Sequence, residues 1–187
     1  INNIKYGVNM KSLKGSQTEK NLYKTFAGEC RARTKYNLFA EEAREEEQHW
    51  IADIFDETAK NEYAHAREVF RRFLGNVGDI ADNLMVAAMG ESDEFKEIYK
   101  EFEETARSEG YEEIAGFFKE LREVEESHNE RYMDFYDKVK SKSLYSSKEP
   151  VKWVCTNCGY IHEGKEAPMN CPLCRFPQGY FRLLNEC

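Results

Sequence analysis

The pattern Glu-x-x-His occurs twice within stretches of helical periodicity, at Glu62 and His65 and again at Glu125 and His128. Residues three apart lie on the same side of a helix, so each pair directs a carboxylate and an imidazole toward one point. Both kinds of side chain bind divalent metal ions. The doubled pattern therefore favours a fold that brings helices together around metal.

A lone glutamate precedes each pair at nearly the same distance. Glu29 lies 33 positions before Glu62, and Glu91 lies 34 positions before Glu125. The chain thus reads as a helix pair written twice, with one glutamate on the first helix and Glu-x-x-His on the second. Four-helix bundles with di-metal centres use this ligand set. We predict a mainly α fold built around such a bundle.

Four stretches carry apolar residues at helical spacing and are expected to be helices: 16–44, 50–74, 79–109 and 111–140. The first begins at a capping box made by Ser16 and Glu19. All four predicted ligand glutamates fall within the apolar stripes, where an unpaired ionised carboxylate is very costly. Few lysines or arginines share those stripes, so a pair of divalent cations is expected between the helices. Imidazole with carboxylate suits iron or manganese, and zinc stays open.

Two further acidic positions qualify the pattern. Glu46 and His49 have the Glu-x-x-His spacing, but they lie in a polar turn without a matched upstream glutamate, so we expect no metal there. Glu94 follows Glu91 by one turn, where the first helix has Ala32 instead. Glu94 is either a plain surface glutamate or a seventh ligand that makes the two metal positions unequal.

The composition changes after residue 140. Residues 141–150 form a polar linker, and from Val151 onward the helical period disappears. Two C-x-x-C pairs lie twelve residues apart in this last segment: Cys155, Cys158, Cys171 and Cys174. Four thiolates at this spacing make a tetrahedral metal site. The spacing alone does not separate iron from zinc.

Charge and hydropathy narrow the classes of partner. The 187 residues include 33% charged side chains and carry a formal net charge of −8, which argues against nucleic acid as the main partner. No apolar run approaches the ~18 residues of a membrane span. Residues 1–10 lack the apolar core of a signal peptide. We expect a cytoplasmic protein whose cysteines bind metal and do not form disulfides.

With these motifs in place, the chain resembles rubrerythrin, a ferritin-like di-iron domain followed by a rubredoxin-like domain. The resemblance covers nearly everything from Met10 to Leu184. Besides the four cysteines, its most specific segments are Lys11–Ser16, Phe26–Glu29, Glu62–His65, Gly90–Glu94, Gly110–Ala115 and Glu125–His128. The residues around the cysteines resemble rubredoxin and favour iron over zinc: Trp153, Gly159, Tyr160, Pro172 and Phe181. The implied domains are an extension (1–9), the di-iron domain (10–140), the linker (141–150) and the rubredoxin-like domain (151–187).

The resemblance implies a non-haem peroxidase. Hydrogen peroxide would be reduced to water at the di-iron centre, and electrons would arrive through the iron bound by four cysteines. An external reductase or rubredoxin must supply them, because the sequence contains no Gly-rich nucleotide-binding loop.

Individual roles follow from the same resemblance. Five ligands would hold the two irons throughout, with Glu62 and Glu125 bridging, Glu29 and Glu91 terminal, and His128 on one iron. The other iron would exchange Glu94 for His65 as the centre is reduced. Tyr36 and Tyr99 match tyrosines near the site and are expected to hydrogen-bond its carboxylates.

Two other functions remain in competition with the peroxidase. A ferritin-like protein would oxidise and store iron, but storage needs neither Glu94 nor an electron inlet made of cysteines. A zinc-stabilised scaffold would have no redox role. Cys30 and Cys187 fit neither cysteine pair; we interpret Cys30 as a small buried apolar residue and Cys187 as a terminal thiol.

The short link between the second and third predicted helices constrains the assembly. In a ferritin-like bundle these helices run parallel, so the link must return along a helix of about 37 Å. Residues 75–78 span only about 14 Å when extended. Either the third helix runs antiparallel to the second, or it joins another chain. We predict a domain-swapped homodimer, alone or within a larger homo-oligomer, in which the first two helices of one chain pack on the last two of another.

Overall fold

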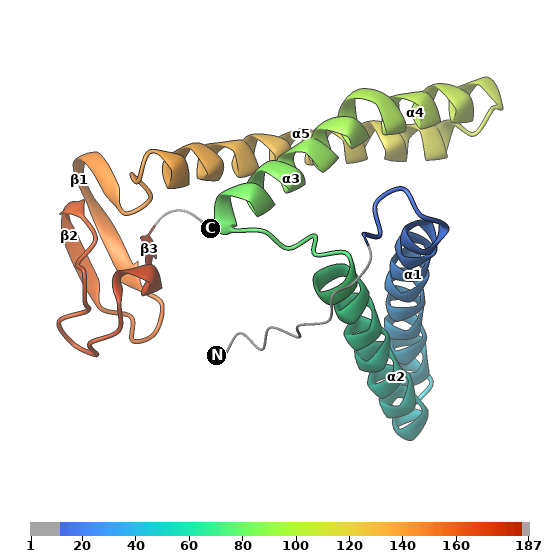
Figure 1. The fold of residues 1–187 in the computed structure, drawn as a ribbon, viewed down its shortest axis with the longest axis horizontal. Helices are drawn as coiled ribbons and strands as arrows, with labels where there is room; N and C mark the ends of the chain where they lie inside the picture. Colours follow the sequence, from blue (N-terminus) through green and yellow to red (C-terminus); the bar gives the residue numbers. More distant parts are fainter. Residues whose placement is uncertain (1–11, 185–187) are drawn as a thin grey trace. The chain divides into compact units, whose positions relative to one another are not determined.

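The computed structural model describes residues 12–184, and it is mainly helical with one small sheet (Figure 1). The helices are α1 (Gln17–Glu45), α2 (His49–Arg67), α3 (Ile80–Asp93), α4 (Tyr99–Ser108) and α5 (Glu112–Lys140). Two π-helical turns, η1 (Glu68–Phe73) and η2 (Glu94–Ile98), continue α2 and join α3 to α4. The sheet contains β1 (Ser146–Cys155), β2 (Ile161–Glu166) and β3 (Phe181–Leu183), with the short 3-10 helix η3 (Gln178–Tyr180) before β3. The extension 1–9 and Cys187 lie outside the described residues.

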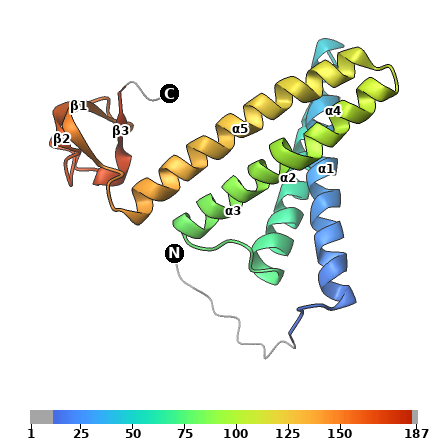
Figure 2. The same cartoon turned by 90° about the horizontal axis from the view of Figure 1, so that it is seen from above.

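The chain divides into two compact units, residues 1–78 and 79–187. The first unit is a helical hairpin of α1 and α2. The second contains another hairpin, in which α3, η2 and α4 run along α5, followed by the sheet (Figures 1 and 2). The prediction of four long helical segments in two pairs is confirmed.

Small residues let the helices of the first hairpin approach closely. Ala40 and Ala52 are fully buried and cluster with Ala43, and Phe55 packs against them. The helix begins where the sequence indicates, because the Ser16 hydroxyl accepts the Glu19 N–H at 3.0 Å. The Glu19 carboxylate in turn accepts the N–H of Gly15 at 2.6 Å. The predicted capping box is thus confirmed, with the return bond one residue upstream of its usual donor.

The second hairpin repeats the aromatic packing of the first. Tyr36 stacks on Phe55 with centroids 6.3 Å apart, and Tyr99 stacks on Phe118 at 6.1 Å. A third ring packs edge-on against each stacked pair. The ring centroid of Phe39 lies 5.6 Å from that of Phe55, and the ring centroid of Phe102 lies 5.5 Å from that of Phe118. The helix pair written twice in the sequence is therefore one packing unit built twice.

The two hairpin turns are also the same. In the first turn, the N–H of Glu47 donates to the carbonyl of Arg44, and the N–H of Gln48 donates to the carbonyl of Ala43. In the second turn, the N–H groups of Gly110 and Tyr111 make the same two bonds, to the carbonyls of Arg107 and Ala106. This Schellman motif needs a left-handed residue after the helix. Glu47 has φ 60° and Gly110 has φ 85°. The second turn therefore has glycine, which tolerates the left-handed conformation, whereas the first turn has a glutamate in the same conformation.

Two helical predictions need correction. The third predicted helix is not continuous, because η2 interrupts it at Glu94, and the second passes into η1 at Glu68. A π turn holds one residue more than an α turn, which hydrophobic periodicity over a long window does not resolve. The fourth helix is continuous through α5, as predicted.

The sheet has the antiparallel order β2-β1-β3. Its core contains Trp153, Cys155, Cys171 and Phe181, and the Trp153 ring N–H donates to the carbonyl of Gly164 at 3.1 Å. β1 begins at Ser146, inside the segment predicted to be a linker, and Ser146 pairs with Glu166. A register shift between Ser146 and Val151 breaks the alternation there, so the strand was not visible as a pattern.

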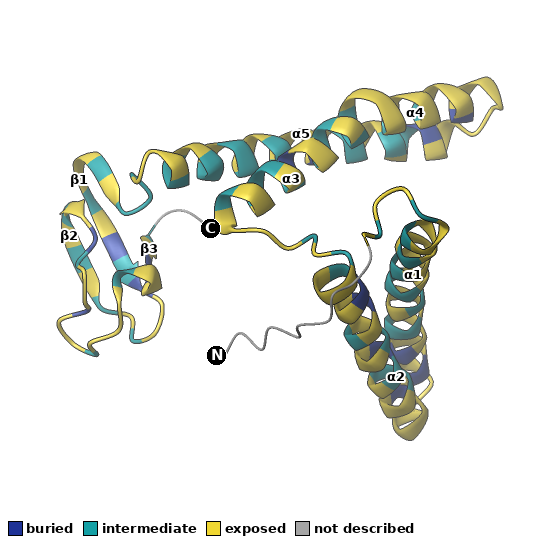
Figure 3. Ribbon diagram, in the orientation of Figure 1, coloured by how far each residue is buried: buried dark blue, intermediate teal, exposed yellow. Residues whose placement is uncertain are grey.

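Exposed residues predominate along both hairpins (Figure 3). Among the described residues, no helix is long and apolar enough to cross a membrane.

The matched turns predict opposite effects of two substitutions. Gly110→Ala should destabilise the protein by about 1 kcal/mol, since an alanine pays the left-handed penalty and no atom lies within 4 Å of the added Cβ to clash with it. Glu47→Gly should stabilise it by about 0.5–1 kcal/mol for the same reason. Thermal unfolding followed by far-ultraviolet circular dichroism measures both. Shifts of the melting temperature in the same direction would contradict this account of the turns.

Candidate metal centres

The first hairpin brings together Glu29 from α1 and the Glu62–His65 pair from α2. His65 Nδ1 lies 2.9 Å from Glu62 Oε2 and 3.8 Å from Glu29 Oε2. One ligand atom from each of the three residues lies within 4.8 Å of the others. Three donors of two chemical types therefore converge on one point, as the spacing predicts.

The second hairpin builds the same group from Glu91 on α3 and the Glu125–His128 pair on α5. His128 Nδ1 lies 2.7 Å from Glu125 Oε2 and 3.7 Å from Glu91 Oε1. These donors again lie within 4.8 Å of one another. We call the two groups the first and second half-sites, because each supplies three of the six ligands expected for a di-metal centre.

The burial of the glutamates differs from expectation. Glu125 is buried, with 8% exposure, whereas Glu29, Glu62 and Glu91 are only half-buried. The His65 side chain is 60% exposed. Two helices enclose a side chain from one direction only, so a hairpin by itself cannot bury its ligands. Full burial requires further helices over the same face.

Electrostatics within each half-site favour a bound cation. A hydrogen bond with Glu62, burial and the Glu62 charge raise the pKa of Glu29, while the bond with Glu29 and His65 lowers the pKa of Glu62. Burial, then a hydrogen bond with Glu125, raises the pKa of Glu91. Adjacent carboxylates cannot both ionise without cost. Divalent iron removes that repulsion, and the mixed carboxylate and imidazole donors fit it.

Glu94 lies in neither half-site, since no group of three or more close donors within residues 12–184 includes it. It lies beside Tyr99 instead: burial, the Glu94 charge and a hydrogen bond to Glu94 raise the pKa of Tyr99. Tyr36 packs on Phe55 in the first hairpin. The proposed roles of Glu94 and the two tyrosines remain predictions.

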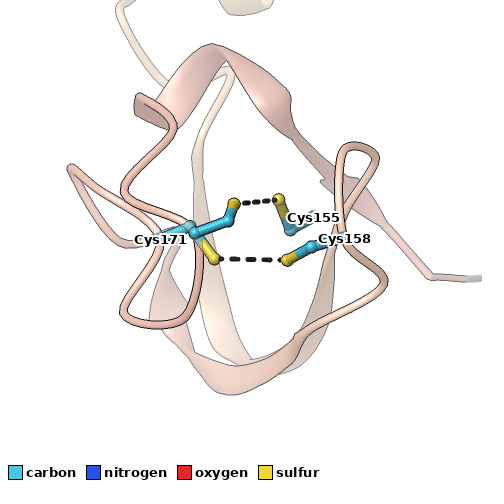
Figure 4. Close-up of side chains that lie close together, drawn as sticks. Cys155, Cys158 and Cys171 are labelled. Carbon is cyan, nitrogen blue, oxygen red and sulfur yellow. Dashed lines mark hydrogen bonds between the residues drawn. The ribbon is translucent and has the colours of Figure 1, made fainter.

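The third group of donors is the four-cysteine cluster of the small domain (Figure 4). Cys155 Sγ lies 3.8 Å from Cys174 Sγ, and Cys158 Sγ lies 3.7 Å from Cys171 Sγ. All four sulfurs lie within 4.8 Å of one another. The predicted pairing of two C-x-x-C segments around one point is present, and four thiolates suit a tetrahedral metal.

The two C-x-x-C turns have the same backbone. Gly159 N–H bonds to the Cys155 carbonyl at 2.8 Å, and Arg175 N–H bonds to the Cys171 carbonyl at 2.9 Å. Both closing residues have positive φ, 77° at Gly159 and 68° at Arg175. The two C-x-x-C segments thus form turns of the same geometry, closed by glycine in the first and by Arg175 in the second.

Proton binding by the thiols also indicates a metal site. The backbone N–H of Phe176, followed by Asn157 and the nearby thiols, lowers the pKa of Cys174 to about 6, against the effect of burial. Although the N–H of Tyr160 opposes it, burial and the other three thiols raise the pKa of Cys158 to about 12. The first thiolate forms easily and the last does not, because negative charge accumulates. A divalent or trivalent cation is needed to hold all four as thiolates.

Glu46 and His49 belong to none of the donor groups found within the described residues, and the absence of a metal site there stays a prediction. Cys30 is a half-buried free thiol, not a buried one. Arg122 and Asn129 of α5 belong to no predicted motif, yet they bond to the backbone carbonyls of Phe95 in η2 and Ala88 in α3. The first hairpin has alanines at the equivalent positions, so a comparison of the repeats could have found them.

The raised pKa values of Glu29 and Glu91 predict proton release on metal binding. These carboxyls hold protons above the ordinary range of about pH 4–4.5, so the metal-free fold loses stability as pH rises from that range through their raised pKa values. Metal must displace the same protons, so its affinity should fall as pH is lowered through this interval. Titration calorimetry with Mn²⁺ in buffers of different ionisation enthalpy measures the release.

The double variant Glu29→Gln/Glu91→Gln separates this release from that of the histidine ligands, and it should release fewer protons per metal. Equal release by the variant and the parent protein would contradict the assignment.

Comparison with known proteins agrees with this geometry. The family model for rubrerythrin matches residues 20–79 and 82–157, and that for the rubrerythrin rubredoxin-like domain matches residues 153–182. Rubrerythrin of Nitratidesulfovibrio vulgaris is 44% identical, with 94% of this chain and 98% of that protein covered. Rubrerythrin of Porphyromonas gingivalis is 41% identical (91% and 92%), and that of Clostridium perfringens 39% (95% and 99%).

These matches confirm the ferritin-like fold class and the rubredoxin-like domain, and with the donor groups they support iron at both kinds of site. The chain belongs to the rubrerythrin family of oxidoreductases.

Proposed function

We propose that this protein is a peroxidase that reduces hydrogen peroxide to water. One observation carries the proposal: the same chain contains two matching Glu, Glu, His half-sites and a four-cysteine site. When bound, a ferrous pair supplies the two electrons that cleave the O–O bond, and the cysteine-held iron passes electrons singly. An iron-storage protein would need the first kind of site without the second.

The protein's own residues hold and adjust this centre. The six half-site ligands lie on helices, which fix their directions, and each histidine aims Nδ1 at its carboxylates. Glu94 lies one turn beyond Glu91, from where it would alternate with His65 as a ligand. The Tyr99 hydroxyl is protonated at neutral pH even at its ordinary pKa, and burial together with the neighbouring Glu94 raises that pKa further, so Tyr99 can donate a hydrogen bond to Glu94.

Electrons would come from an external reductase or rubredoxin that docks near the four cysteines. The sequence offers no Gly-rich nucleotide-binding loop with which to draw them from a nucleotide directly. The grouping of Cys155, Cys158, Cys171 and Cys174 as metal ligands, without a disulfide among them, supports a reducing compartment such as the cytoplasm as the location.

We further propose that the complete centre forms in a domain-swapped dimer. The link between Phe73 and Ile80 extends about 20 Å at most, while the preceding helical segment of about 25 residues is about 37 Å long. Phe39 and Phe102, in the aromatic groups next to the ligands, stay 46% and 43% exposed. Joining the first hairpin of one chain to the second hairpin of another would bury these rings and bring the two half-sites together.

Mixed dimers test the swap. A Glu62→Ala chain paired with a Glu125→Ala chain should form one site lacking both glutamates and one site with all six ligands. Isolated with two different affinity tags, such dimers should therefore recover about half of the parental peroxide turnover and about half of the iron bound by the glutamate and histidine ligands, while the iron at the four cysteines stays unchanged. Unswapped chains would give only the average of the two defective variants, an outcome that would rule out the exchange.

Glu94 separates the peroxidase from the storage protein. Glu94→Ala should retain its iron but reoxidise with peroxide more slowly, by at least the roughly tenfold effect typical of groups that tune a metal site. Glu97→Ala, an exposed glutamate on the same π turn, is the matched control and should behave as the parent. Stopped-flow absorbance of the diferrous protein measures both.

Unchanged peroxide kinetics in Glu94→Ala would remove Glu94 from the mechanism. Reoxidation of the parent protein by dioxygen as fast as by peroxide, with accumulation of ferric mineral, would favour the storage function instead.

A further inference from the structure

The two hairpins differ by one residue, and the difference lies next to Glu94. Tyr36 follows Glu29 by seven residues, whereas Tyr99 follows Glu91 by eight. The tyrosines are equivalent, since each stacks on the phenylalanine of the same aromatic group. α1 is continuous across this stretch, while the second hairpin contains the π turn η2. The extra residue is therefore accommodated as a π turn that begins at Glu94.

This turn takes a hydrogen-bond donor away from one carbonyl. The N–H of Tyr99 bonds to the carbonyl of Glu94, whereas in an α-helix it would bond to that of Phe95. Arg122 of α5 takes the vacated place, because its Nε donates to the Phe95 carbonyl at 3.2 Å. Its Nη1 simultaneously donates to Glu103 at 2.8 Å. One planar guanidinium thus bonds a backbone carbonyl through Nε and a carboxylate through Nη1, with the two donors held in a fixed relative geometry.

The first hairpin has no such group. Ala59 lies three residues before Glu62, as Arg122 lies three before Glu125. Ala40 occupies the position of Glu103, four residues after the equivalent tyrosine, and both alanines are buried. The fold of a hairpin therefore does not require an ion pair here. The pair occurs in the hairpin whose ligand-bearing stretch contains the π turn η2, at a place where α1 of the first hairpin is continuous.

A second α5 side chain holds the other end of the same stretch. Asn129 Nδ2 donates to the carbonyl of Ala88 at 2.6 Å, and the equivalent residue in the first hairpin is Ala66. The segment from Ala88 to Phe95, which contains Glu91 and Glu94, is thus bonded to α5 at both ends. Neither bond has a counterpart in the first hairpin.

We propose that Arg122 is a positioning residue that holds the π turn Glu94–Ile98 and thereby sets the position of Glu94. The inference rests on the proposed function only in the role given to Glu94; the hold on the turn itself is a property of the protein without turnover. The ion pair with Glu103 directs the guanidinium, and the bond to Phe95 fixes the backbone. Glu94 then moves by side-chain rotation on a fixed turn.

Three variants of the full-length, iron-loaded protein test this. Arg122→Met removes both bonds and keeps the aliphatic stem. Arg107→Met is the matched control, since Arg107 also bonds to Glu103, at 3.1 Å, and its second bond goes to Glu112, outside the turn. The double variant Glu103→Ala/Arg122→Ala installs the residues of the first hairpin and leaves no half-buried carboxylate without its partner.

Amide hydrogen exchange of residues 95–100 is the primary measurement. It should accelerate about tenfold or more in Arg122→Met and in the double variant, with no change in Arg107→Met, as expected for loss of a bond from a charged donor. In Arg122→Met and in the double variant, the kcat for peroxide should fall while KM and iron content stay near parental values. Exchange rates equal to those of Arg107→Met would overturn the inference.

The two proposals fail separately. If Glu94→Ala turns over normally, the proposed role of Glu94 is lost, while the exchange data still decide whether Arg122 holds the turn. If exchange accelerates but kcat does not fall, Arg122 stabilises the backbone without positioning a group that matters to turnover, and the functional part of the inference is wrong.

Discussion

The contact between two carboxylates within each half-site constrains everything else in the helical part. Glu29 with Glu62, and Glu91 with Glu125, lie within hydrogen-bonding reach, and the pKa of one partner is raised in each case. Such pairs are unfavourable in a metal-free fold and favourable around a cation. Each half-site has three donors, which is too few for a closed di-metal centre. The proposed di-metal centre would therefore need one half-site from each kind of hairpin, whichever chains provide them.

The helices around these contacts pack through small buried side chains. Buried alanines, not large apolar residues, line the approach of α1 to α2, so the helix axes lie close and the ligands project from fixed backbones. The aromatic groups then support the ligand-bearing stretches from one side. The small domain also repeats a local structure, since two C-x-x-C turns with the same backbone hydrogen bond place four sulfurs around one point. Metal ligands in both parts depend on repeated local geometry.

That repetition explains which parts of the structure could be predicted from the sequence and which could not. Glu62 with His65, Glu125 with His128 and the cysteine pairs have spacings that local geometry alone converts into convergent donors, so they were predictable. The π turn at Glu94 was not, because one added residue hardly disturbs a hydrophobic stripe. Its traces in the sequence were differences of one residue, in the Glu29–Glu62 and Glu91–Glu125 separations and in the spacing from Glu29 to Tyr36 and from Glu91 to Tyr99. The half-burial of the glutamates depends on packing between hairpins, which no single helix pattern encodes.

A doubled scaffold on its own would produce two equivalent metal positions. The second hairpin departs from the first at Glu94, at the π turn and at the two α5 side chains that bond to the stretch around it. These departures lie together, and the rest of the hairpin keeps the repeat in its turn, aromatic group and ligands. Because inserting a residue exposes a carbonyl that an alanine at position 122 could not satisfy, the π turn and Arg122 depend on each other. The asymmetry between the two hairpins therefore centres on one helical turn and on the two α5 side chains that bond to the stretch around it.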